Sequence, residues 1–240
     1  MLTRSWRAPS PGRPEVPLPP ARMPLMRGGR PLKRWSYVGA YGPNLMLCAT
    51  RGRVGVIPFS WWAVWDGERL REGSGRLDVE IEGGAEIEVV SPHGAQYIWT
   101  RKYEARVRFE GRELRGIVDQ SAGYHARHTA WHWSVGVGTL TTGEPVTWNL
   151  VDGVHDLPEA SERTVWVAGE PREVPPVPFD GLRGVGGLRF ERVAVRAARE
   201  NYLLVRSDYE QPFGTFSGGV PGAGELREGW GVMERHDVRW

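Results

Sequence analysis

The sequence predicts an antiparallel all-β protein, a sandwich or barrel made of two successive β halves. Short runs with alternating apolar and polar residues follow one another from Trp35 onward, with almost no segment of helical period. Turn signals such as Gly42-Pro43-Asn44 separate these runs every ~8–12 residues. Strands that follow one another without intervening helices do not form βαβ units, so the sheets are expected to be antiparallel.

The net charge and the length of the apolar runs limit the kinds of partner that we expect. Lys+Arg 31 against Asp+Glu 29 leaves a net charge of +2, which gives no reason to expect nucleic acid or an anionic membrane as a partner. No apolar run approaches the ~20 residues of an integral membrane segment.

The single cysteine, Cys48, lies in an apolar run and is expected to be a buried packing residue. A chain without a disulfide pair fits a reducing compartment, so we expect a cytoplasmic protein. The oligomeric state is not indicated.

The N-terminal arm, residues 1–34, is dominated by Pro, Arg and Gly, a composition that excludes helix and interior strand. Two interpretations stay open. The arm is either an extended, mobile segment or a strap over the fold, anchored by its apolar residues Leu18, Met23, Leu25 and Met26.

The first β half is expected over residues 35–119. Its strands are predicted at 35–41, 45–51, 54–65, 77–82, 87–90, 105–109 and 114–119. Gly83-Gly84 is predicted to turn the chain between two of them. In the run 77–82 the apolar residues alternate with acidic ones, which predicts one buried and one solvated face.

The second β half is expected over residues 120–240, with the junction near 119–127. Its strands are predicted at 129–137, 146–150, 163–167, 188–195, 202–208, 213–218 and 231–240. A helical turn is predicted only at Ala197–Asn201.

The hairpin from Gly116 to Val151 is the predicted binding site, because it holds three of the six histidines and three of the twelve tryptophans. Most tryptophans are expected in the core, yet such an aromatic excess in a β-barrel also suits a cavity for an apolar ligand. The candidate ligand-binding residues are Tyr124, Trp131, His132, Trp133, Trp148 and Asn149, together with Trp61 from the first half.

The spacing of His125, His128 and His132 resembles a metal motif but does not suit one. On a strand, positions four apart are separated by ~13 Å, too far for one ion. No metal site and no cofactor are predicted.

The C-terminal strand carries the candidate acid–base residues. Alternation places Glu234 and His236 on the apolar face of this strand, whereas Asp237 falls on the charged face. A carboxyl among apolar residues has a raised pKa, which is how a general acid stays protonated near neutrality. The alternative is structural, with Glu234 paired to a buried arginine, Arg206 or Arg163.

Two further candidates lie near the junction. Asp119 ends a strand there, either as a turn cap or as a carboxylate that points into a cavity facing His128.

Five tracts carry a family resemblance: residues 17–24, 123–131, 148–156, 211–218 and 231–237. Together they resemble a bacterial family known only as a domain of unknown function. More distantly, through its architecture and the tract Trp131-His132-Trp133, the chain is similar to the lipocalin-like (calycin-like) superfamily of carotenoid 1,2-hydratase (hydroxyneurosporene synthase), kievitone hydratase and certain fungal Diels–Alderases. The resemblance implies two successive barrel-like domains and cofactor-free chemistry on apolar substrates. It supplies no catalytic residue, since no spacing matches closely.

The expected function is therefore a cofactor-free lyase or isomerase, such as an alkene hydratase, that acts on a hydrophobic small molecule. Glu234 would donate the proton, and His236, Asp119 or His128 would orient water. One alternative is a non-catalytic carrier or sensor of a lipid-like ligand. Another is a structural or partner-binding protein, which would require an interior without a ligand-sized void.

Overall fold

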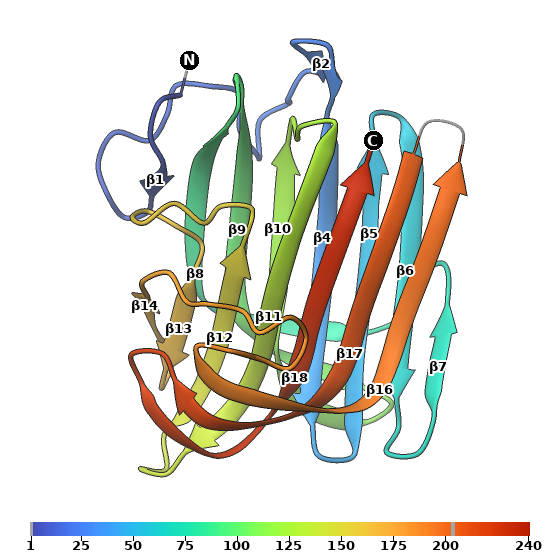
Figure 1. The fold of residues 1–240 in the computed structure, drawn as a ribbon, viewed down its shortest axis with the longest axis vertical. Helices are drawn as coiled ribbons and strands as arrows, with labels where there is room; N and C mark the ends of the chain where they lie inside the picture. The colour runs from blue at the N-terminus through green and yellow to red at the C-terminus, as the bar shows by residue number, and fades with distance from the viewer. Residues whose placement is uncertain (1, 203–204) are drawn as a thin grey trace.

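A computed structural model of the chain describes residues 2–202 and 205–240 (Figure 1). All extended regular structure there is β-strand, and neighbouring strands run antiparallel, which confirms the predicted fold class. Over these residues no helix has the length and apolar character needed to cross a membrane.

The first sheet has eight strands in the order β1-β8-β9-β10-β4-β5-β6-β7. Its strands are β1 (Trp6–Arg7), β4 (Lys33–Gly42), β5 (Leu45–Val54), β6 (Ile57–Trp65), β7 (Leu70–Gly73), β8 (Glu80–His93), β9 (Gln96–Phe109) and β10 (Arg112–Gly123). A small separate hairpin is formed by β2 (Met26–Arg27) and β3 (Arg30–Pro31).

The second sheet also has eight strands, in the order β14-β13-β12-β11-β18-β17-β16-β15. Its strands are β11 (His128–Leu140), β12 (Pro145–Asp152), β13 (Thr164–Val167), β14 (Glu170–Glu173), β15 (Gly184–Val185), β16 (Gly187–Tyr202), β17 (Val205–Val220) and β18 (Gly224–Arg239). Positions 203 and 204 of the strand predicted at 202–208 lie outside the described residues. The chain crosses from one sheet to the other between Gly123 and His128.

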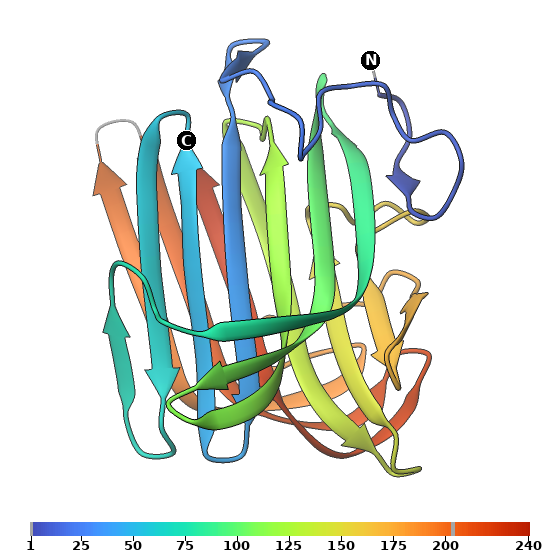
Figure 2. The same ribbon diagram turned by 180° about the vertical axis from the view of Figure 1, so that it is seen from behind.

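The two sheets separate three apolar cores: one lies between the sheets and one lies on the outer face of each sheet. The central core lies between the sheets, where Tyr37 and Met46 of the first sheet meet Trp133, Val135 and Phe213 of the second. Each sheet also bends over its own outer face and encloses a further core. The start of β8 runs across the first sheet in Figure 2, and the ends of β16 to β18 sweep across the second in Figure 1. Each half is therefore a curled sheet.

Glycine at position 83 makes one of these bends possible. Gly83-Gly84 does not turn the chain as predicted; it lies inside β8, where the register with β9 shifts between Gly83 and Glu86. A β-bulge bends a strand without ending it, and glycine is favoured at such positions. At Gly83 a Cβ would lie 3.1 Å from the Tyr103 ring.

The predicted helical turn at Ala197–Asn201 is also wrong. These residues belong to β16 and pair with residues 206–210 of β17. Alanines and charged residues favour helix only weakly, and pairing with a neighbouring strand overrides that preference.

The N-terminal arm is a strap. Leu18 and Met23 are buried in a fourth apolar cluster with Trp99 and Tyr124, whereas Leu25 and Met26 are exposed. The hydroxyl of Tyr124 donates to the carbonyl of Pro24 at 2.8 Å.

Candidate active site

Glu234 lies in the central core on the inner face of β18 and is 6% exposed. Three side chains from the two flanking strands donate hydrogen bonds to its carboxyl group. Trp131 Nε1 on β11 donates to Oε1 at 2.7 Å, and on β17 Tyr209 Oη and Gln211 Nε2 donate to Oε2 at 3.1 and 2.8 Å. The alternation of the strand therefore placed this carboxyl correctly on the buried face.

No cation pairs with Glu234 among the described residues, so the predicted pairing with an arginine is wrong. Arg163 instead donates to the main-chain carbonyls of Asp156, Leu157 and Val174, and Arg206 is exposed. Burial raises the pKa of Glu234 to about 7, although the three hydrogen bonds act in the opposite direction. Near neutrality the carboxyl is poised between its two protonation states.

Of the three partners of Glu234, only Tyr209 can accept a hydrogen bond from the carboxyl when the carboxyl is protonated. An indole N–H and an amide NH₂ only donate, whereas a phenol hydroxyl can both donate and accept. The O–H of protonated Glu234 must therefore be on Oε2, directed at the hydroxyl of Tyr209. The pKa of Tyr209 is raised well above its usual value by burial and by the nearby Glu234, so its hydroxyl stays protonated.

His236 is next to Glu234 on the same face and touches the same rings. Its imidazole lies 4.4 Å from the Trp131 ring and 5.1 Å from the Tyr209 ring, and Nε2 is 2.8 Å from Ser207 Oγ. Burial lowers the pKa of His236 to about 4, so the ring is neutral at physiological pH. A neutral imidazole can orient water as donor or acceptor but is a weak base here.

Across the central core, the first sheet presents two phenols and a thiol to this carboxyl. Tyr37 Oη and Tyr41 Oη share a hydrogen bond of 2.8 Å. Cys48 is fully buried, as predicted, and its Sγ donates to Gln211 Oε1 at 3.2 Å, which fixes the amide with its NH₂ toward Glu234. This link could not be predicted from the sequence, because Cys48 and Gln211 are on different sheets.

Arg196 closes the cluster toward solvent and was not predicted. The guanidinium of this β16 residue lies 3.9 Å from the centre of the Trp61 ring and 5.0 Å from that of Tyr209. Arg196, Trp61 and His236 are only half-buried. The Glu234 cluster therefore reaches the surface on this side.

A second polar cluster occupies the same core. Lys102 Nζ is 2.7 Å from Asp119 Oδ2 and 3.3 Å from Glu162 Oε1, and Thr100 Oγ1 donates to Asp119. Burial acts to lower the pKa of Lys102, but the two carboxylates outweigh it and the pKa is raised. Burial raises the pKa of Glu162 to about 7, with Lys102 opposing and Asp119 adding to the shift. His155 Nε2 lies 4.0 Å from Glu162 Oε2.

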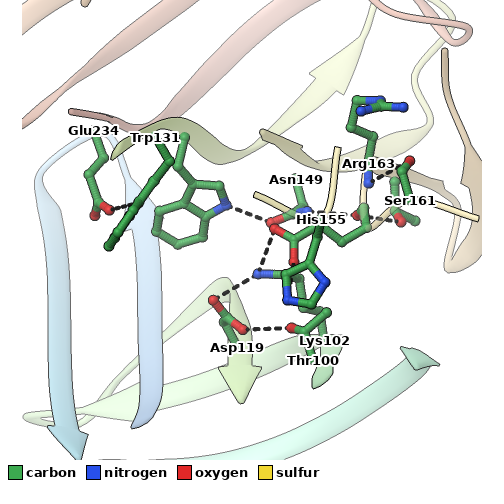
Figure 3. A network of polar contacts seen from close by, with 12 residues as sticks. Thr100, Lys102, Asp119, Trp131, Asn149, His155, Ser161, Arg163 and Glu234 are labelled. Atoms are coloured by element: carbon green, nitrogen blue, oxygen red, sulfur yellow. Dashed lines mark hydrogen bonds and ion pairs between the residues drawn. The ribbon is translucent and has the colours of Figure 1, made fainter. Parts of the chain in front are cut away.

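Figure 3 shows how this second cluster extends toward the tryptophans of β11. Trp133 Nε1 donates to Asn149 Oδ1 at 2.7 Å, and Asn149 Nδ2 donates to the main-chain carbonyl of Glu162 at 2.8 Å. The ammonium of Lys102 lies 5.3 Å from the centre of the Trp133 ring. Asp119 therefore pairs with lysine and does not face His128.

Four predicted site residues lie away from Glu234. His128 is exposed and pairs with Asp237 at 2.9 Å, and His132 stacks on Phe179. Tyr124 lies beneath the N-terminal strap, and Trp148 packs with Phe216 in the outer core of the second sheet. Side chains on opposite faces of one strand point apart, so a single hairpin could not bring all the predicted site residues to one site.

Two concavities that are open to solvent lie away from this site. Both lie on the bend of β8 and β9, one around Ile81 and Arg106 and the other around Gly83 and Tyr103. The rings of Trp61, Trp131 and Trp133 instead pack against the central core. The aromatic cavity stays a prediction.

No family model and no curated protein matches the chain, so its resemblance to a domain-of-unknown-function family also stays a prediction. Among solved structures, a Nitrosomonas europaea protein provisionally named AttH is similar at 11% identity, over 94% of this chain and 98% of that one (TM-score 0.37). Kievitone hydratase from Nectria haematococca is similar at 10% identity, over 85% and 88% (TM-score 0.35). CghA is similar at 8% identity, over 87% and 88% (TM-score 0.38). Kievitone hydratase is also named in the superfamily that the chain is expected to resemble through its architecture and the tract Trp131-His132-Trp133.

Proposed function

We propose that the protein is a cofactor-free lyase or isomerase that transfers a proton to or from a hydrophobic small molecule, with Glu234 as the acid–base group. The observation that carries the proposal is a carboxyl buried among aromatic rings, held by neutral donors alone and with its pKa near 7. A general acid or base is most effective when its pKa is close to the working pH.

In the hydratase form of the proposal, Glu234 protonates one alkene carbon and becomes a carboxylate. Water then forms the C–O bond at the other carbon, and its released proton returns to Glu234, so that atoms and charge balance. The N–H groups of Trp131 and Gln211 stabilise the carboxylate while it exists. His236, whose ring lies 4.4 Å from that of Trp131, would orient the water. His128 and Asp119 pair with other side chains instead.

The substrate would enter where Arg196 and Trp61 separate the cluster from solvent. Hydratase activity in kievitone hydratase is consistent with this class of reaction but does not decide it.

A non-catalytic role is the second candidate. The packing of Trp61, Trp131 and Trp133 in the central core favours a structural or partner-binding protein over a carrier with a preformed cavity. A carrier or sensor of a lipid-like ligand would have to open the same aromatic cluster.

The test begins with native mass spectrometry of the purified protein and identification of any small molecule extracted from it. That molecule, and a panel of isoprenoid alkenes, is then incubated with the protein in H₂¹⁸O, and products are examined for added ¹⁸O or shifted double bonds. We expect turnover by the wild type and a loss of about 10²–10⁴-fold in Glu234→Gln, with ligand binding retained. Full turnover in Glu234→Gln would show that the acid–base assignment is wrong. Binding without product in any assay would support the carrier.

The matched control is Glu191→Gln, which changes an exposed carboxyl on β16 and should leave turnover unchanged.

A further inference from the structure

The near-neutral net charge of the chain conceals a strong asymmetry. Between Val16 and Trp65 there are seven Lys or Arg residues and no Asp or Glu. The rest of the chain has 24 basic against 29 acidic residues. A segment of fifty residues with a charge of +7 is therefore balanced by an acidic remainder.

Much of this basic segment gathers at one end of the molecule, where the β2–β3 hairpin lies against the turn between β5 and β6. Gly55 N donates to the carbonyl of Leu32 at 2.7 Å, and Leu32 N donates to that of Leu25 at 2.8 Å. Both turns lie at the top of Figure 1, near the C-terminus.

The two turns expose aliphatic side chains to solvent. Leu25 and Met26 are 47% and 57% exposed, and Val56 and Ile57 are both 68% exposed. They are four of the eight large apolar residues that the described part of the chain exposes, and the others lie on different segments. Apolar residues at the tips of adjacent turns bring no stability to the folded chain, so their clustering indicates an interaction surface.

Three exposed arginines lead to these turns along β4 and β5. Arg34 is directly opposite Arg53, and Arg51 is two positions along the same strand, so the three share a face. Like charges at paired positions destabilise a sheet. None of the three has an ion-pair partner within residues 2–202 and 205–240. An anionic partner would remove this repulsion. We call the two apolar turns and these three arginines the basic tip.

We propose that the basic tip docks on an anionic membrane surface, with the aliphatic turns inserted among the lipid headgroups and the arginines against lipid phosphates. This combination is that of peripheral membrane-binding proteins, in which a small buried apolar area and several basic groups act together. The phosphates of nucleic acid would also attract arginines, but phosphate contacts make no use of exposed apolar turns. The apolar residues of the tip are aliphatic, so they offer no ring on which bases could stack. The proposal departs from the expectation drawn from net charge, and it does not depend on the function proposed for Glu234.

The test is co-sedimentation of the full-length protein with vesicles of phosphatidylcholine alone or mixed with phosphatidylglycerol, at low and high salt. We expect binding to the mixed vesicles that weakens with salt, and little binding to phosphatidylcholine alone. Arg34→Gln/Arg51→Gln/Arg53→Gln should lower the partition coefficient about a hundredfold, at roughly fivefold per charge. Val56→Ser/Ile57→Ser should lower it by about tenfold or more.

Two matched variants change the same residue types elsewhere. Val193→Ser/Val195→Ser removes another exposed apolar pair, and Arg76→Gln/Arg172→Gln/Arg192→Gln removes three other exposed arginines; both should bind as the wild type does. Equal binding to both kinds of vesicle, or equal losses in the tip and control variants, would overturn the proposal. So would binding to duplex DNA that exceeds binding to vesicles and is insensitive to Val56→Ser/Ile57→Ser. The vesicle and salt comparison needs only the wild type, so it decides even if a variant unfolds.

Discussion

Two buried glutamates share the central core, and their partners differ. Glu162 lies 3.3 Å from the ammonium of Lys102, which also holds Asp119, whereas Glu234 has only the neutral donors Trp131, Tyr209 and Gln211. Burial raises the pKa of both carboxyls to about 7. The first arrangement pairs two carboxyl groups with one ammonium and ties β9 and β10 to the loop before β13. The second leaves a carboxyl that can gain or lose a proton without breaking an ion pair, which is what acid–base chemistry requires.

The largest effect is expected at Lys102. In Lys102→Met, two carboxyl groups would stay buried without their cation, and we expect a loss of roughly 3–5 kcal/mol in the free energy of unfolding at pH 7, measured with urea. Adding Asp119→Asn and Glu162→Gln to the same protein should restore most of the loss. A loss below about 1 kcal/mol in the single variant would show that this cluster is not a structural ion pair.

The next effect is the contribution of Glu234 to the pH dependence of stability, which a comparison with Glu234→Gln separates from that of Glu162. The pKa of Glu234 is about 7 in the folded protein and 4.5 as its ordinary value. The folded protein therefore retains a proton that the unfolded chain releases, so this contribution to stability is complete below pH 4.5 and is lost as the pH rises to about 7. The stability of the wild type relative to Glu234→Gln should fall by about 3 kcal/mol across that window. Glu191→Gln should leave the curve unchanged, and a flat difference for Glu234→Gln would refute the raised pKa.

A smaller effect is expected from Trp131→Phe, which removes the indole N–H that donates to Glu234. The carboxylate loses one of three donors, so unfolding above pH 7 should require about 1–2 kcal/mol less free energy. The midpoint of the Glu234 titration should move to higher pH. Trp62→Phe, whose indole donates to a main-chain carbonyl near the surface, is the control and should not move this midpoint.

The smallest effect is expected at His128. Its pair with Asp237 is half-exposed on the outer face of the sheet that carries Glu234. His128→Ala should change the free energy of unfolding by less than about 0.5 kcal/mol. A change in turnover in this variant would contradict the geometry, which keeps His128 away from the Glu234 cluster.

Features that depend on alternation along a single strand could be predicted from the sequence. The period of two in β18 placed Glu234 and His236 on the buried side and Asp237 on the exposed one. The all-β class could also be predicted, because runs with the period of a strand are far more numerous than runs with the period of a helix.

Features that depend on pairing between strands could not be predicted. Lys102 and Glu162 meet only because β9 faces the loop before β13 across the core, and each looks like a surface residue in its own segment. The same limit applies to Gln211 and Cys48, which are 163 positions apart. Net charge concealed the basic tip, because a sum over the chain contains no information on where the charges lie.

The position of β18 has a consequence for how the chain acquires its structure during synthesis. This strand lies between β11 and β17, and Trp133 pairs with Glu234 across about a hundred residues of chain. The first sheet can form once residues up to Gly123 have left the ribosome. In the second sheet, one edge of β11 stays unpaired until residues 224–239 have been synthesised. A chain truncated before Gly224 would keep that edge unpaired, and an unpaired strand edge favours aggregation.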